Sequence, residues 1–417
     1  MGLAFLVFKI IILFLELYYL YWCYLYIYPF LQNITPLIES PSFNLVRNAN
    51  NIIIEKAIRF LNLPQWSRNF HSCSSQKSEI NCAQLIEAYQ TIKNWSEIGP
   101  NRPSYAVVHI KPKCGIGNSF YHLLTGALVG FALNRTIHIV KDLDGIIYNP
   151  LLSNTQSWNC KQFGHWPIMN QEYWQRNTAE SLKAANVHIT TTFTYPYFLL
   201  TEPGLSTFIY KHFGIHFVYF IGNFLISYNE KIRNTVFELF NSVPRSIKVI
   251  GVHIRTHKSK SHFYIESQKK VQDVVIPFLN QLLENKNYVA LATDWDIYTN
   301  LFKKVYPKNL IMADVSRNPD GNKYDAATDI FLLMMCNKMI GTFRSSFSAF
   351  AGMCAMHRIY YVSMEYPTVF QFTNSQAGII SGIYENHGDF NYYVNQRVKL
   401  FPNIESAIRT FFRNVVY

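Results

Sequence analysis

The 417-residue chain lacks the short patterns that identify several common protein classes. Its seven cysteines include no CxxC pair and no other zinc-ligand spacing, which argues against a structural zinc site. It has no repeat of solenoid period and no run of five Lys or Arg residues. The net charge of +12 is therefore scattered, and we expect no nucleic-acid partner. Only 15% of the residues are charged and 49% are hydrophobic, so the composition argues against disorder.

The cysteines divide into one that lies in an N-terminal hydrophobic segment, Cys23, and six others. An even set of six is compatible with an oxidising compartment. Cys73 and Cys82 are close enough in sequence for a local bridge. Cys336 and Cys354 lie in apolar stretches and are expected to be buried thiols.

The N-terminal residues 1–30 are almost wholly apolar or aromatic, interrupted by Lys9 and Glu16. A bilayer-spanning helix needs about 20 apolar residues, so this segment predicts a transmembrane signal anchor. A cleaved signal peptide is the alternative, but no small-x-small cleavage site follows the segment. We therefore expect a single-pass type II protein of the Golgi membrane with its catalytic part in the lumen. The sequons at Asn33, Asn94 and Asn134 are compatible with a glycoprotein in that compartment.

The rest of the chain alternates between strand and helix patterns after a stem and lead-in region, 31–100, with an expected helix over 83–94. Such alternation predicts parallel βαβ units. The expected strands are AVVHI, RTIHIV, IKVIGVHI, YVALAT, NLIMAD, KMIGT and RIYYV. Single helices are expected over 119–133, 265–284, 296–305, 325–336 and 346–356, and more than one helix between about 202 and 240. The stretch 145–200 has no clear pattern. A restart near residue 245 indicates two facing Rossmann-like domains, 101–245 and 246–417.

The first candidate site feature is the sequence CGIGN, which follows the strand AVVHI and precedes an apolar helix. Gly115 and Gly117 would let the backbone approach a ligand closely, with Asn118 beside them. A tight turn without a ligand is the alternative. The third glycine of the dinucleotide fingerprint is missing.

The second feature is the strand end GVHIR. Alternation along the strand places His253 and Arg255 on the same face. A guanidinium is well suited to grip a diphosphate through two parallel hydrogen bonds. The alternatives are a core histidine and a surface arginine. The strand YVALAT is likewise followed by Asp294, which could face a ligand or cap the next helix.

The third feature is the stretch from Asp329 to Ala355, where an acidic residue precedes a helix, the strand KMIGT and a turn of small polar residues. Ligands of open α/β sheets bind beyond the carboxyl ends of the strands. A helix start with free N–H groups and hydroxyls suits a phosphate. The stretch therefore predicts one wall of a nucleotide pocket, formed by Thr342, Ser345 and Ser346, with a solvated serine-rich turn as the alternative.

In their order and context these motifs resemble the GDP-fucose-dependent fucosyltransferases of the GT-B fold. The plant xyloglucan-type α1,2-fucosyltransferases are the most similar branch. The resemblance covers about residues 105–365, including CGIGNSFYHLLTGALVGFALNRTIHIVKD and ATDIFLLMMCNKMIGTFRSSFSAFAG. It implies an α/β GT-B fold and inverting transfer of L-fucose from GDP-β-L-fucose to a glycan hydroxyl, with an α1,2 linkage expected.

The resemblance also implies roles for individual residues. Arg255 would bind the β-phosphate, and His253 and Asp329 would contact the guanine side of the nucleotide. The diphosphate would be lined by Ser345, Ser346 and Phe347. Gly115, Gly117 and Asn118 would face the phosphates from the acceptor-side domain, and Asp294 would be an accessory residue of the cleft.

The sequence identifies the general base and the metal requirement less clearly than the donor site. Asp142 and Asp144 follow the strand RTIHIV and could act as general base, or could cap the core. The same pair, or Asp294 with Asp296, would suit Mn²⁺ in a GT-A enzyme, but the arginine grip makes a metal unnecessary, and we expect no metal or other cofactor. A transferase for another nucleotide sugar, or a glycan-binding membrane protein without turnover, are the other interpretations.

Overall fold

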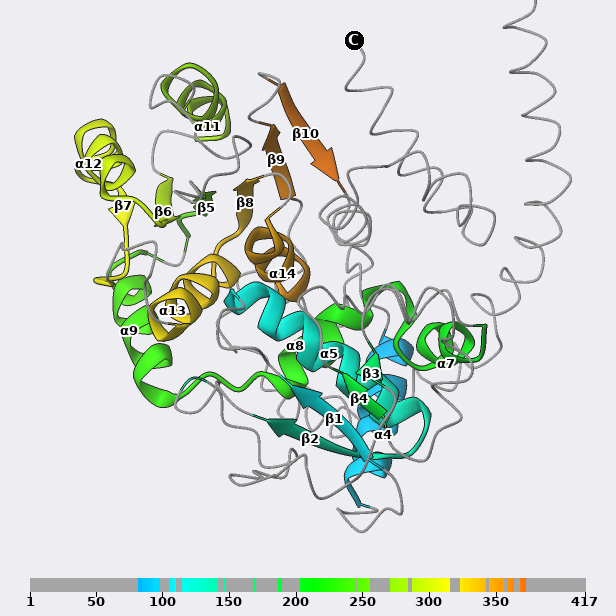
Figure 1. Cartoon of the computed structure of the whole chain (residues 1–417). Helices are drawn as coiled ribbons and strands as arrows, with labels where there is room; N and C mark the ends of the chain where they lie inside the picture. The colour runs from blue at the N-terminus through cyan, green and yellow to red at the C-terminus, as the bar shows by residue number, and fades with distance from the viewer. Residues whose placement is uncertain are drawn as a thin grey trace, which may run out of the picture. The chain divides into compact units, whose positions relative to one another are not determined.

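A computed structural model describes 14 segments of the chain. They are residues 82–97, 105–109, 115–140, 146, 168–169, 187–189, 203–244, 246–255, 271–283, 287–315, 323–342, 345–355, 359–363 and 368–372. These segments contain two β-sheets and the helices that pack on them (Figure 1). Both sheets belong to one compact unit of the chain, Ile54–Tyr417.

The first sheet has the strand order β2-β1-β4-β3, and all its strands are parallel. The strands are β1 (Tyr105–His109), β2 (Thr136–Val140), β3 (Ile168–Met169) and β4 (Val187–Ile189). Helix α5 (Ile116–Ala132) connects β1 to β2. The chain therefore leaves β1 toward β2 on one side and returns to β4 on the other, which makes the β1/β4 boundary a switch point of the sheet.

The second sheet has the order β10-β9-β8-β5-β6-β7. Its strands are β5 (Val249–Ile254), β6 (Tyr288–Thr293), β7 (Leu310–Ile311), β8 (Lys338–Thr342), β9 (Ile359–Ser363) and β10 (Thr368–Phe372). β10 is antiparallel to β9, and the other pairings are parallel. The chain adds β6 and β7 on one side of β5 and then β8 and β9 on the other. The switch point of this sheet lies between β5 and β8.

Helices cover both faces of the second sheet because β5 is apolar on both sides. Ile250, Val252 and Ile254 pack with the face covered by the π-helical turn η4 (Val271–Val275), α11 (Ile276–Leu282) and α12 (Asp296–Val305). The opposite face is covered by α13 (Lys323–Met334) and α14 (Ser346–Cys354). Glycines in the strands let α13 and α14 pack closely against the sheet. A Cβ on Gly341 would lie 2.8 Å from Cβ of Ser348 in α14.

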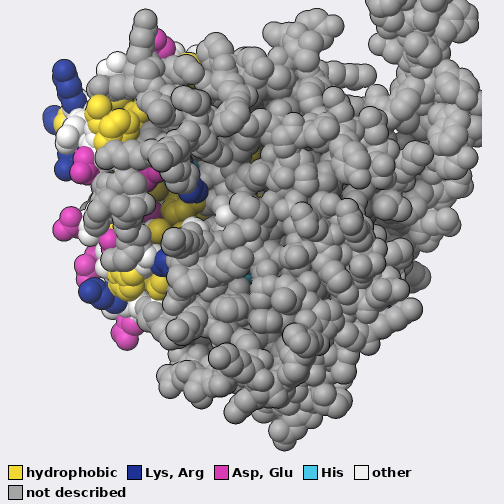
Figure 2. All heavy atoms as spheres, in the orientation of Figure 1, with side chains coloured by type: hydrophobic (Ala, Val, Ile, Leu, Met, Phe, Trp, Pro, Cys, Tyr) yellow, Lys and Arg dark blue, Asp and Glu magenta, His cyan; other side chains and the backbone are white. Residues whose placement is uncertain are grey.

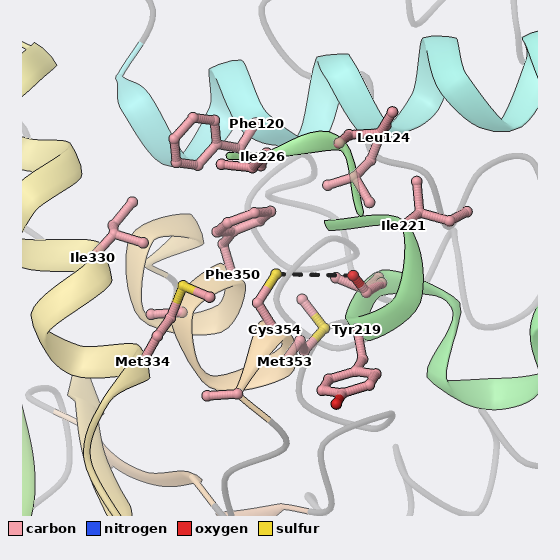
Figure 3. Close-up of a cluster of buried hydrophobic side chains, with 14 of the residues drawn as sticks. Phe120, Leu124, Tyr219, Ile221, Ile226, Ile330, Met334, Phe350, Met353 and Cys354 are labelled. Carbon is pink, nitrogen blue, oxygen red and sulfur yellow. Dashed lines mark hydrogen bonds between the residues drawn. The ribbon is translucent and has the colours of Figure 1, made fainter. Parts of the chain in front are cut away.

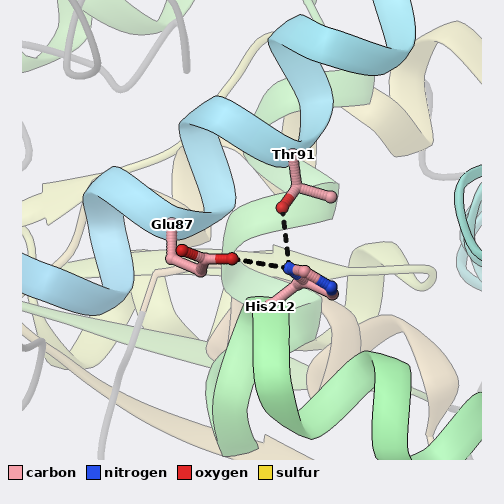
Figure 4. Close-up of polar contacts among 3 residues, drawn as sticks. All are labelled: Glu87, Thr91 and His212. Carbon is pink, nitrogen blue, oxygen red and sulfur yellow. Dashed lines mark hydrogen bonds and ion pairs between the residues drawn. The ribbon is translucent and has the colours of Figure 1, made fainter.

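The helices α4 (Cys82–Glu97), α7 (Pro203–Phe213), α8 (Phe217–Leu225) and α9 (Glu230–Asn241), with the short 3-10 turn Gly214–His216, complete the fold. Helix α4 packs against α7 through a half-buried polar contact (Figure 4). Nδ1 of His212 lies 2.6 Å from Oε1 of Glu87 and 3.0 Å from Oγ1 of Thr91. This contact fixes the lead-in helix to the helices that follow the first sheet.

A single core connects the first sheet's helices with α13 and α14 (Figure 3). Phe350 of α14 lies between rings of α5, with ring centroids 4.9 Å from Phe120 and 5.7 Å from Tyr121. Nδ2 of Asn223 in α8 donates to the carbonyl of Cys354 at 2.7 Å. Helix α14 is thus packed by side chains from α5 and α8, and its position is determined from both sides.

The expected alternation of strands and helices is confirmed for most of the described chain, including the exact bounds of α12. One prediction was wrong in detail, and three strands were not predicted. Helix α5 begins at Ile116 rather than near residue 119, so Gly117 and Asn118 lie in its first turn and not in a loop before it. The stretch 145–200, which has no sequence pattern, contains β3 and β4. Strand β10 was not predicted.

The expected N-terminal anchor, at residues 1–30, and Cys73, one half of the possible Cys73–Cys82 bridge, lie outside the described residues. Within the described part, no helix has both the length and the apolar character needed to cross a bilayer. Cys336 and Cys354 are buried free thiols, as expected. On the face shown in Figure 2, the coloured Lys and Arg side chains are interspersed with Asp and Glu.

Candidate functional site

The predicted site residues gather where β5 and β8 end, at the switch point of the second sheet. The ladder between these strands stops at the pair Val252 and Ile340. Beyond it, β5 continues beside β6 and β8 continues beside β9. Two parallel strands that part at their carboxyl ends open the crevice in which α/β proteins bind ligands. His253 and Arg255 come from one side of this crevice and Thr342 from the other.

The hydroxyl of Thr342 joins the two diverging strand ends. It donates to the carbonyl of His253 at 2.9 Å and accepts from the backbone N–H of Arg255 at 3.0 Å. Thr342 is 4% exposed. Its side chain therefore replaces the missing ladder bonds and fixes the backbone from which the Arg255 side chain projects.

Thr342→Val is expected to lower the free energy of unfolding by about 2 kcal/mol or more, because each unsatisfied buried polar group costs about 1–3 kcal/mol. The substitution preserves shape but leaves the His253 carbonyl and the Arg255 N–H without this partner. Chemical unfolding followed by circular dichroism measures the change. Thr342→Ser keeps the hydroxyl and should lose much less. Equal losses in the two variants would contradict the assignment.

His253 is buried beneath the first turn of α14. Its ring stacks on Phe347, with centroids 4.5 Å apart and planes inclined by 14°. Its Nδ1 lies 2.6 Å from Oγ of Ser348. Burial, and secondarily the charge of Arg255, lowers the pKa of His253 to about 3. The ring is thus neutral at physiological pH and can offer one donor and one acceptor, but no charge, to a ligand.

The depressed pKa of His253 predicts a loss of stability in acid. Its folded pKa, about 3, lies below the ordinary 6.5, so between these values the unfolded chain binds more protons than the folded one. The free energy of unfolding should fall as the pH drops through this window, by up to about 1.4 kcal/mol per pH unit. Thermal melts between pH 7 and pH 4.5 test this. His253→Gln should show a shallower fall of Tm than the wild type, and an unchanged slope would contradict the prediction.

Ser345 and Ser346 lie where α14 begins. Ser345 is the N-cap residue but makes no side-chain capping bond, and its N–H donates to the carbonyl of Thr342 at 3.2 Å. It is 1% exposed, and among the described residues its hydroxyl has no hydrogen-bond partner. A buried hydroxyl without a partner costs free energy unless a ligand satisfies it. It lies at a helix start whose first N–H groups also need acceptors.

Gly117, in the first turn of α5, touches the first turn of α14. A Cβ at this position would lie 2.8 Å from the backbone nitrogen of Phe347 and 2.9 Å from the carbonyl carbon of Ser346. Helix α5 has Gly115 as its N-cap and therefore no capping side chain. Two helix N-termini, each with partial positive charge, are thus in contact. The arrangement favours a shared anion, and it unites the predicted glycine motif with the predicted serine turn.

For the other residues predicted for the site, the structure gives the element in which each one lies. Asn118 is half-buried in the first turn of α5, and Asp294 is half-buried after β6, the strand next to β5. Asp329 is buried in α13, which packs on α14 and β5. Asp142 and Asp144 lie outside the described residues.

Ser348 is a contact residue of the site that sequence reasoning missed. It is fully buried, and its Oγ accepts from the N–H of Thr342 at 3.1 Å in addition to contacting His253. The only sequence signal was a small polar residue inside an otherwise apolar helix, three residues after Ser345.

Glu87, Thr91 and His212 form the other described cluster with a histidine, but their geometry is not that of a catalytic relay. Both Oε1 of Glu87 and Oγ1 of Thr91 approach the same ring nitrogen, Nδ1 (Figure 4). A relay needs the nucleophile and the acid on opposite nitrogens of the ring. This cluster therefore joins helices α4 and α7 and does not define a second active site.

Two parallel α/β sheets whose switch points meet at paired helix N-termini define an architecture of the GT-B type. A solved structure shares it. A mutant of Arabidopsis thaliana FUT1 in complex with GDP aligns with a TM-score of 0.56 at 12% identity, covering 73% of this chain and 90% of that chain. The fucosyltransferase NodZ from Bradyrhizobium aligns with a TM-score of 0.45 at 14% identity, covering 66% of this chain and all of that one. No family model and no curated protein matches the chain. The GT-B fold expected from the motifs is thus supported by FUT1.

Proposed function

We propose that this protein is a fucosyltransferase that binds GDP-fucose at the β5/β8 switch point and transfers the sugar to a glycan hydroxyl. The observation that carries the proposal is the contact between the first turns of α5 and α14, beside the buried Ser345 hydroxyl, which has no hydrogen-bond partner in the described part of the chain. Helix N-termini and a buried hydroxyl suit a diphosphate. The fold shared with FUT1, which was solved with GDP, and the motif resemblance favour GDP-fucose as the donor.

The residues present suit an inverting displacement. The acceptor hydroxyl attacks C1 of fucose from the face opposite GDP, and the bond between C1 and the diphosphate oxygen breaks. Negative charge then builds on the leaving diphosphate. Arg255 and the two helix N-termini stabilise that charge more strongly in the transition state than in the bound donor. His253, neutral by its low pKa, contributes a hydrogen bond rather than charge.

Further parts of the proposal rest on the sequence. Asp142 or Asp144 takes the proton of the acceptor hydroxyl, and Asp329 binds the guanine edge. The linkage is α1,2, by the resemblance to the xyloglucan-type enzymes. The N-terminal segment anchors the protein in the Golgi membrane as a type II protein, with the site in the lumen. No metal takes part, since Arg255 and the helix termini supply the positive charge.

The test uses the full-length protein in detergent. Calorimetric titration with GDP, UDP and ADP should show binding of GDP with clear preference. Labelled GDP-fucose and a panel of glycan acceptors should give a labelled product, equally with and without EDTA, and linkage analysis identifies the bond. Equal binding of UDP or ADP would favour another nucleotide sugar, and GDP binding without transfer to any acceptor would favour a binding protein. Absence of GDP binding would overturn the proposal.

A further inference from the structure

Ser348 lies at the point where three elements of the site meet. It belongs to α14, its Oγ contacts Nδ1 of His253 from β5 at 2.6 Å, and it accepts the N–H of Thr342 from β8 at 3.1 Å. Its side chain is fully buried, and those of Thr342 and His253 are 4% and 6% exposed. The cluster is thus largely removed from bulk solvent, and its protons can be assigned from the hydrogen bonds among the protein groups.

The assignment begins with Thr342. Its backbone N–H can only donate, so it occupies a lone pair of the Ser348 oxygen. The Ser348 hydroxyl can still donate its own proton, and Nδ1 of His253 lies 2.6 Å from its oxygen. A neutral imidazole has one protonated and one unprotonated nitrogen. If Ser348 donates to Nδ1, the ring proton must be on Nε2.

The position of the ring is fixed by the same elements. Phe347 stacks on one face of the imidazole, and Thr342 bonds the carbonyl of His253 itself. Among the described residues, the hydrogen bonds of the His253 side chain use Nδ1 alone. Nε2 thus remains for a ligand in the crevice.

We propose that Ser348 is a positioning residue that selects the Nε2–H tautomer of His253, so that His253 donates a hydrogen bond to an oxygen of the bound nucleotide. The inference rests on the proposed function for the nature of the ligand, but the tautomer itself does not depend on it. Ser348 does not touch the donor. It acts through His253, much as an orienting group fixes the tautomer of a catalytic or metal-bound histidine.

The low pKa of His253 supports this assignment, because the ring stays neutral across the pH range in which a transferase works. A neutral ring has a tautomer to select, whereas a protonated ring would donate from both nitrogens. The selection would therefore persist in mildly acidic compartments.

The first measurement is of the tautomer in the full-length protein without ligand. Histidine-selective ¹⁵N labelling and long-range ¹H–¹⁵N correlation separate protonated from unprotonated ring nitrogens, and His253→Gln assigns the signals. Wild-type His253 should have its proton on Nε2. In Ser348→Ala the signals should move toward a mixture or toward Nδ1–H, and Ser348→Cys, which keeps a weak donor, should lie between. A wild-type Nδ1–H tautomer, or no shift in Ser348→Ala, would overturn the proposal.

The second measurement is of ligand binding, with GDP as the probe. Ser348→Ala should weaken GDP binding about tenfold, the scale of one lost hydrogen bond. Thr125→Val is the matched control, since it removes another buried hydroxyl, which donates to the Tyr121 carbonyl inside α5 at 2.9 Å. It should lower Tm without changing the tautomer or the GDP affinity. Parallel changes in both variants would indicate a merely structural role for Ser348. Failure of the wild type to bind GDP would count against the proposed function and leave the tautomer result standing.

Discussion

Arg255→Ala is expected to reduce the rate of fucosyl transfer by about a hundredfold or more, the scale for removing one donor to a transition-state charge. Arg255 directly follows β5, where the ladder between that strand and β8 has already ended. In the proposed function its guanidinium is the cation that binds the diphosphate. The decrease should be seen in kcat/KM with labelled GDP-fucose, and GDP affinity measured by calorimetry should fall as well.

Two controls separate the loss of the side chain from a loss of structure. The backbone N–H of Arg255 still bonds to the Thr342 hydroxyl in any Arg255 variant, so β5 should stay in place and Tm should change little. Arg255→Lys retains the charge but not the planar fork of donors, and should recover only part of the activity. Activity at the wild-type level in Arg255→Ala would refute the placement of the diphosphate at this strand end.

The central part of this fold could be predicted because its strands are buried on both faces. Strands of that kind are continuous apolar runs, and VIGVHI and YVALAT stand out in the sequence. The polar residues that follow such strands must lie at one edge of the sheet. His253, Arg255 and Thr342 lie at or after the ends of such strands, and in the structure the Thr342 hydroxyl bonds to the backbone of both His253 and Arg255.

Other parts could not be predicted because their signals are not local. Strands β3 and β4 have two and three residues, too few for a period to appear. The contact between Ser348 and His253 joins residues 95 positions apart, and depends on how closely α14 lies on β8. The close packing is possible because Gly341 has no side chain. A glycine in a strand does not by itself indicate which helix packs on it. The start of α5 was misplaced because its first turn contains Gly117 and Asn118, which favour a loop in isolation.

Gly117→Val is expected to disrupt the site. Its new Cβ would lie 2.8 Å from the backbone nitrogen of Phe347 and 2.9 Å from the carbonyl carbon of Ser346. These are backbone atoms at the start of α14, and they cannot rotate away as a side-chain tip could. Helix α14 is also packed on its other sides by Phe120 and by Asn223. Overpacking of this kind costs about 1–3 kcal/mol or more.

The expected effect on GDP binding depends on which parts of α5 and α14 must move apart. The strain can be relieved only by moving the first turn of α5 away from that of α14, which separates the two N-termini proposed to share the diphosphate. GDP binding, measured by calorimetry, should become undetectable or weaken by about two orders of magnitude, the scale set by an N–H donor pair lost from an anion site.

Gly115→Ala is the matched control for stability, because a Cβ there meets no atom within 4 Å, and Gly115 has an ordinary φ of −62°. Its Tm should fall only slightly, because Ala is a poorer N-cap residue than Gly, whereas Gly117→Ala should already lose several degrees. A Gly117→Val protein that melts and binds GDP like the wild type would mean that the two helix starts are not in contact, and the shared anion site would then have no structural basis.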